Sequence, residues 1–77
     1  MQAFETMLRI IANSGKSRDE LSRMMGLSRH YLTTTIGKKS VVRLDNFARL
    51  ADVCGYTLLV RHRKTGDEIV IDPPTTD

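Results

Sequence analysis

The sequence predicts a mainly α-helical fold, a four-helix bundle that continues into a C-terminal β-hairpin. Up to Cys54, apolar residues recur at the three- and four-residue spacing of amphipathic helices, and glycines separate the stretches. After Gly55 the pattern changes to the two-residue alternation of strands, in two runs joined by a glycine-containing turn. We therefore expect a helical domain at residues 1–55, a hairpin at 56–72 and a disordered tail with two prolines at 73–77.

The first helix is expected from about Gln2 to Asn13, and the segment Asn13-Ser14-Gly15 ends it. Its apolar face consists of Phe4, Met7, Leu8 and Ile11, with Ala12 beside them. A second helix begins at Ser17, which forms a capping box with Glu20. Its apolar stripe consists of Leu21, Met24 and Met25.

A third helix follows after a tight turn. Gly26 ends the second helix, because a helix this short must stop where the backbone takes a left-handed conformation. Ser28 is expected to cap the third helix, with Leu27 and Leu32 forming a hydrophobic staple. Gly37 is expected to end it. The outward residues carry hydrogen-bonding groups and no carboxylate: Arg29, His30, Thr33 and Thr34.

The fourth helix follows the apolar pair Val41-Val42 and ends at Gly55. Its apolar stripe consists of Leu44, Phe47, Ala48, Leu50, Ala51 and Cys54. Asp45 is the candidate cap. A single cysteine excludes an internal disulfide framework, and its position favours a small buried thiol over a reactive one.

The hairpin has apolar residues on both faces. Its first run, residues 56–63, alternates between one face with Tyr56, Leu58, Val60 and His62 and another with Thr57, Leu59, Arg61 and Arg63. The turn is expected at Lys64–Asp67, with Gly66 in a left-handed position, and His62 is interpreted as a surface residue. One face can cover the helical core, so the other needs a partner. We expect a homodimer formed through Leu58, Leu59, Val60, Ile69, Val70 and Ile71.

Positive charge is concentrated in the middle of the chain. The whole sequence has a net charge of +3, whereas residues 16–40 alone carry +4. In that segment two acidic residues, Asp19 and Glu20, stand against six basic ones: Lys16, Arg18, Arg23, Arg29, Lys38 and Lys39. Scattered surface charge is the simpler interpretation, but the coincidence with the paired helices favours a polyanionic partner.

These paired helices resemble those of the lambda-repressor/Cro-like (XRE) helix-turn-helix family. The matching residues are Leu21, Gly26, Leu27, Ser28, Arg29 and Leu32. The later residues Leu44, Phe47, Leu50, Ala51 and Gly55 look like that family's following helix. The resemblance covers roughly Phe4 to Gly55. It implies a lambda-repressor-like bundle of four to five helices, in which the first helix packs behind a DNA-binding second and third helix.

The chain departs from the family pattern at three places. Ser22 stands where the family usually has Ala, a change we expect to be harmless because both are small. Thr35 stands where an aliphatic residue is usual, so Ile36 is expected to turn into the core. Strand-like sequence replaces the usual fifth helix.

The resemblance implies that double-stranded DNA is the partner. Arg29, His30, Thr33 and Thr34 would then contact bases, with guanine the target of arginine. Phosphate contacts are expected from Lys16, Ser17, Arg18, Ser28, Lys38, Lys39 and Arg43. A solvated basic turn is the alternative for the lysines at 38 and 39, and a plain surface arginine is the alternative at 43. Two subunits would read a palindromic operator with half-sites about one helical turn apart.

Three functions stay open. The first is a repressor-like transcriptional regulator of phage or mobile-element type, the second an antitoxin that also represses its own operon, and the third a protein-binding or inhibitor module on the same fold. Because the expected hairpin is apolar, a toxin or another protein stays open as a partner. We expect no enzyme activity, cofactor or metal, because His30, His62 and Cys54 do not cluster and no catalytic motif is found. Without a signal pattern or a long apolar run, we expect no membrane association and a cytoplasmic location.

Overall fold

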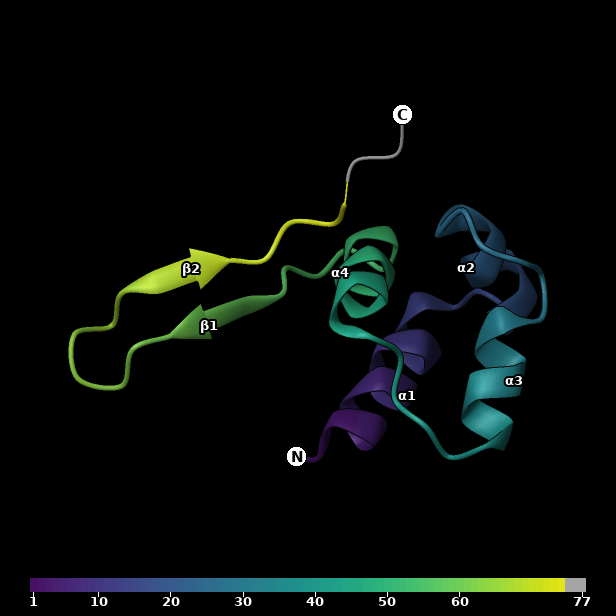
Figure 1. Ribbon diagram of the computed structural model, residues 1–77, viewed down its shortest axis with the longest axis horizontal. Helices are drawn as coiled ribbons and strands as arrows, with labels where there is room; N and C mark the ends of the chain where they lie inside the picture. The colour runs from purple at the N-terminus through teal and green to yellow at the C-terminus, as the bar shows by residue number, and fades with distance from the viewer. Residues whose placement is uncertain (75–77) are drawn as a thin grey trace.

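The computed structural model describes residues 1–74, and within them the chain forms four helices and a two-stranded antiparallel hairpin. The elements are α1 (Ala3–Ser14), α2 (Arg18–Met24), α3 (Tyr31–Gly37), α4 (Leu44–Val53), β1 (Leu59–Arg61) and β2 (Glu68–Val70). The helices form one body and the hairpin projects away from it (Figure 1). The expected mainly α-helical class is therefore confirmed. No helix of the described residues is long and apolar enough to cross a membrane.

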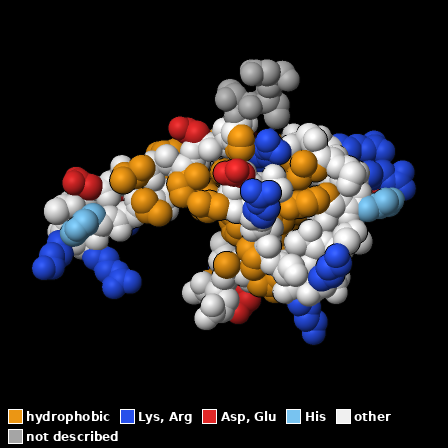
Figure 2. All heavy atoms as spheres, in the orientation of Figure 1, with side chains coloured by type: hydrophobic (Ala, Val, Ile, Leu, Met, Phe, Trp, Pro, Cys, Tyr) orange, Lys and Arg blue, Asp and Glu red, His pale blue; other side chains and the backbone are white. Residues whose placement is uncertain are grey.

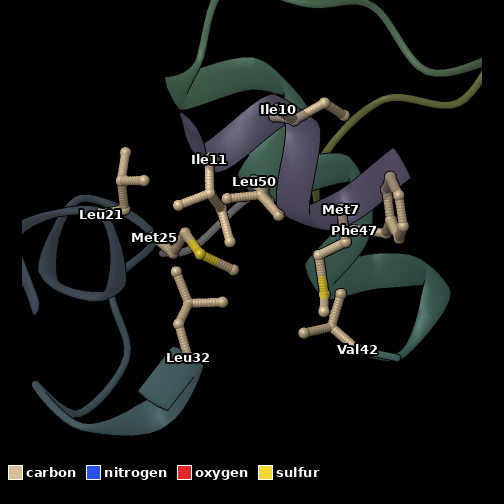
Figure 3. Packing of buried hydrophobic residues seen from close by; sticks show 9 residues of the cluster. All are labelled: Met7, Ile10, Ile11, Leu21, Met25, Leu32, Val42, Phe47 and Leu50. Atoms are coloured by element: carbon tan, nitrogen blue, oxygen red, sulfur yellow. The ribbon is translucent and has the colours of Figure 1, made fainter. Parts of the chain in front are cut away.

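The core lies where the apolar faces of all four helices meet (Figure 3). Its buried members are Met7, Ile10, Ile11, Leu21, Met25, Leu32, Val42, Phe47 and Leu50. Phe4, Leu27 and Ile36 pack against this cluster from its edge, so Ile36 occupies the position expected of it. Thr35, beside it, turns its hydroxyl to the carbonyl of Tyr31 at 2.9 Å.

Several predicted core positions are wrong. On α1 the buried face includes Ile10, whereas Leu8 is half-buried and Ala12 is exposed, so the helix is rotated toward Ile10. Met24 and Leu44 are 47% and 60% exposed. Met24 is the last residue of α2 and Leu44 the first residue of α4, and helix ends extend past a core this small.

The ends of α2 and α3 use the same hydrogen-bond pattern with different residues. After α2, Gly26 has φ 79°, and the amide of Leu27 donates to the carbonyl of Ser22 at 3.0 Å. After α3, the left-handed residue is Lys39, with φ 55°, and the amide of Ser40 donates to the carbonyl of Thr35 at 3.1 Å. Gly37 is therefore the last helical residue and not the terminator that was expected. A side chain in this conformation is strained by roughly 1 kcal/mol.

The strands are shorter than their apolar runs. Three residue pairs define the register, Leu59 with Val70, Val60 with Ile69 and Arg61 with Glu68, and residues 60–70 are all exposed. Leu58, at the root of the hairpin, packs against the core. The expectation that one whole face covers the core is wrong, because the hairpin leaves the body after this residue (Figure 1).

His62 organises the hairpin turn and is more than a surface residue. Its Nδ1 accepts the backbone amides of Lys64 at 3.1 Å and Thr65 at 3.3 Å, and its carbonyl accepts the amide of Gly66 at 2.9 Å. Gly66 has φ 79°, as predicted for this turn. The imidazole thus satisfies amides that would otherwise depend on water.

After β2 the chain returns to the helical body. Pro73 and Pro74 are half-buried and line a shallow groove with Met24, Gly26 and Arg49. Residues 73 and 74 have no regular secondary structure, and the disorder expected of residues 73–77 stays a prediction. Residues 75–77 lie outside the part of the chain that the structure describes.

Candidate nucleic-acid interface

The start of α3 is held by a residue of α2. Ser22 is fully buried, and its Oγ accepts the amide of Leu32 at 3.1 Å while donating to the carbonyl of Arg18 at 2.8 Å. The amide of Leu32 belongs to the first turn of α3, where intrahelical acceptors are missing. Ser22 therefore caps α3 from the neighbouring helix. Ser22 is therefore more than a harmless replacement for Ala, because Ala could not make this hydrogen bond.

The predicted cap at Ser28 is wrong. The helix begins at Tyr31, and in the described part of the chain Ser28 contributes only its backbone carbonyl, which accepts the amide of Tyr31 at 3.0 Å. Its hydroxyl makes no hydrogen bond there and the residue is exposed. As a consequence Arg29 and His30 lie in the turn before α3 and not inside its first turn. The predicted cap at Asp45 is also wrong, since Arg43 precedes α4 and no side chain caps that helix.

The four candidate base-contacting residues are brought together on one exposed surface. The side chains of Arg29 and His30 are 55% and 65% exposed. Thr33 and Thr34 are exposed on α3, three and four residues after His30 and hence on the same side of the helix. Leu32 of the same helix is fully buried. Guanidinium, imidazole and hydroxyl groups at this spacing can donate to and accept from base edges.

A carboxylate lies against this surface. Oδ2 of Asp19, on α2, is 3.3 Å from Nε of Arg29, and its Oδ1 is 3.8 Å from Nδ1 of His30. The sequence prediction of a carboxylate-free face holds only within residues 28–37. Asp19 was missed because it is ten residues earlier in the chain than Arg29 and reaches it across the packing of α2 on α3.

The predicted phosphate-contacting residues are all exposed: Lys16, Ser17, Arg18, Ser28, Lys38, Lys39 and Arg43. Figure 2 shows Lys and Arg side chains gathered over the α2–α3 side of the body, and a second group at the tip of the hairpin. Ser17 caps α2 as predicted, accepting the amide of Glu20 at 3.1 Å. The reciprocal bond from the Glu20 side chain is absent among the hydrogen bonds of residues 1–74, so the capping box is only half formed.

A side-chain hydrogen bond ties the first residue of α3 to α4. The phenol oxygen of Tyr31 accepts Nδ2 of Asn46 at 2.9 Å, and Oδ1 of Asn46 in turn accepts Nη1 of Arg49 at 3.3 Å. Sequence reasoning gave no role to these residues, because their spacing matches no local motif. Together with Ser22, they fix the outward surface of α3 relative to the body.

Cys54 is half-buried beside the core, as a small packed thiol would be. Burial raises the pKa of the Cys54 thiol, while the charge of Lys16 and a hydrogen bond from Ser14 act in the opposite direction. Among residues 1–74, no three His, Cys, Asp or Glu side chains are grouped as metal ligands would be.

Comparison with known proteins gives no match: the chain matches no protein-family model, no curated protein and no solved structure. The resemblance to the XRE helix-turn-helix family therefore rests on the sequence residues quoted for it.

Proposed function

We propose that the protein is a sequence-specific regulator of transcription that binds double-stranded DNA through a lambda-repressor-like helix-turn-helix formed by α2 and α3. The observation that carries the proposal is the exposed row of donors at the start of α3, opposite a fully buried Leu32. A helix of seven residues is about 10 Å long, and its N-terminal end fits the major groove, which is about 12 Å wide.

In this proposal the residues divide into two groups. Arg29 reads a guanine, and His30, Thr33 and Thr34 contact neighbouring base edges or thymine methyl groups. The exposed basic residues around them contact phosphates and fix the position on the duplex. The strained backbone at Lys39 supports such a role, because a glycine would relieve the strain but would remove the cation.

A dimer is part of the proposal, formed through the hairpin. Val60 and Ile69 form a cross-strand pair and are 53% and 69% exposed. Leu58, next on the same face, lines an apolar groove of the body with Val41 and Leu44, so hairpin face and groove are continuous. The accessible surface is 5586 Å², about 900 Å² more than the roughly 4,700 Å² expected for a compact monomer of this size. A standard interface buries about 800 Å² on each partner.

The dimer is tested by light scattering after size exclusion. Wild type is expected to elute as a dimer at micromolar concentration and Ile69→Lys as a monomer with unchanged helix content. Thr65→Lys, which adds the same charge at the exposed turn, is the matched control and should stay dimeric. A wild-type monomer would remove the dimer from the proposal.

DNA binding is tested by fluorescence anisotropy, with DNA from upstream of the gene and with scrambled DNA, at two salt concentrations. Arg29→Ala is expected to cost about 1–3 kcal/mol on the preferred DNA and to relax the preference at one position. Lys38→Ala should weaken both DNAs alike and lower the salt dependence. If wild type binds both DNAs equally and loses both with added salt, the reading function is wrong.

An antitoxin that also represses its own operon is the second candidate. The exposed apolar faces of the hairpin favour it, because they could hold a toxin in place of a second subunit. A toxin that co-purifies with wild type but not with Ile69→Lys would support this candidate, whereas a stable homodimer that captures no partner would contradict it.

A further inference from the structure

The ion pair between Asp19 and Arg29 uses one particular edge of the guanidinium. The short contact, 3.3 Å, is to Nε, and no other Asp or Glu among residues 1–74 pairs with Arg29. A guanidinium has five N–H donors. A partner at Nε occupies the side edge, which Nε shares with one terminal nitrogen, and leaves the outer N–H of each terminal nitrogen pointing away from it. These two outer N–H groups form one of the donor pairs that can bind O6 and N7 of guanine. Asp19 can therefore hold Arg29 without competing with a base.

The same carboxylate also faces the second residue of the reading surface. Its other oxygen lies 3.8 Å from Nδ1 of His30. Asp19 itself is anchored, because it is the second residue of α2, whose start is capped by Ser17. The side chains of Arg29 and His30 are otherwise exposed and lie in a turn outside α3. Asp19 is thus the charged contact of Arg29, whereas its 3.8 Å distance from His30 is too long for a hydrogen bond.

We propose that Asp19 is a positioning residue that sets the base preference of Arg29, by fixing the guanidinium side-on so that its terminal nitrogens meet a guanine. The inference rests on the proposed function. It assigns Asp19 a second effect as well: its negative charge beside the phosphate-contacting surface disfavours random DNA, where Arg29 has no guanine to meet. Loss of the carboxylate should therefore weaken specific binding and strengthen random binding.

The test compares Asp19→Asn with Glu20→Gln. Both remove one negative charge from the first turn of α2, but the carboxylate of Glu20 makes no ion pair in the described part of the chain. Each protein is titrated against the duplex that wild type selects from a random pool and against a scrambled duplex. Asp19→Asn is expected to lower the ratio of the two affinities about five- to tenfold. Glu20→Gln should strengthen both affinities equally and leave the ratio within about twofold.

Two further measurements separate positioning from a structural role. In an Arg29→Ala background, Asp19→Asn should no longer change the ratio, since the residue it positions is gone. In the DNA-free protein, the NMR signal of the Arg29 Nε–H group should shift in Asp19→Asn and stay unchanged in Glu20→Gln. The melting temperatures of the two variants should match each other, because both lose one carboxylate from the first turn of α2 and the exposed ion pair of Asp19 contributes little stability.

The outcomes are distinguishable. One outcome would overturn this inference and leave the proposed function intact: wild type prefers its selected duplex, and Asp19→Asn and Glu20→Gln have the same ratio of affinities for the selected and the scrambled duplex. An effect of Asp19→Asn that persists without Arg29 would also overturn it. A wild type that selects no duplex from the pool would overturn both the inference and the proposed function.

Discussion

Replacing Ser22 by Ala tests the cap that crosses from α2 to α3. The hydroxyl is the sole partner of the Leu32 amide in the described structure, and the site is fully buried. An amide left there without an acceptor costs about 1–3 kcal/mol. Ala has a higher helix propensity than Ser by about 0.5 kcal/mol, which offsets part of the loss. We expect Ser22→Ala to lower the free energy of unfolding by about 1–2 kcal/mol.

Ser28→Ala is the matched control, because it removes the same hydroxyl from the position where sequence reasoning places the cap. Its hydroxyl is exposed and unbonded in the structure, so the loss should stay within about 0.5 kcal/mol. The assay is thermal and urea unfolding followed by circular dichroism. At about 4–8 °C per kcal/mol for a domain of this size, Ser22→Ala should melt about 5–15 °C below wild type. All proteins are compared at one concentration, since a dimer's melting temperature depends on it.

A larger loss of stability in Ser28→Ala than in Ser22→Ala would contradict the cap from Ser22. If Ser28→Ala were destabilising and Ser22→Ala were neutral, α3 would begin at the cap expected from the sequence, and Arg29 and His30 would lie inside its first turn. The position of the candidate base-contacting residues relative to α3 would then need to be reassigned.

The other predictions concern a strained backbone and a titrating thiol. Lys39→Gly should raise the free energy of unfolding by about 0.5–1 kcal/mol, because it relieves the left-handed backbone, and should weaken DNA binding. Lys38→Gly removes the same charge at φ −86° and should lower the free energy of unfolding. Urea unfolding measures the stability of both variants, and fluorescence anisotropy measures their DNA binding. Burial raises the pKa of Cys54 above its ordinary value of 9.0, against the opposing effects of Lys16 and Ser14. The unfolded chain then loses this proton first, so stability should fall as pH rises through about 9 and above, and Cys54→Ser should remove that component from the urea midpoints.

Local patterns predicted the features that depend on neighbouring residues in the chain. The cap at Ser17, the left-handed turn at Gly26 and the turn glycine at Gly66 each follow from a few residues, and all three are found. Ile36 was placed correctly because a polar residue at 35 left one apolar side chain available for the core.

Features that depend on two separate elements were not predictable in this way. The bond from Ser22 to Leu32 joins residues ten positions apart, and a local cap at Ser28 is a reasonable prediction until the two helices are packed together. The contact of Asp19 with Arg29 has the same origin. The hairpin was predicted only in part. The alternation of apolar and polar residues identifies the strands, but it does not show whether the helical body can cover them.

The two ends of the described chain lie beside different surfaces, which matters for the placement of affinity tags. Ala3 lines the apolar groove next to Val41 and Leu44, so an N-terminal tag would sit at the proposed dimer surface. Pro74, the last described residue, lies in the groove with Met24 and Gly26, beside the turn between α2 and α3. Tags at opposite ends would therefore lie near different proposed surfaces, the dimer surface in one case and the DNA-binding surface in the other.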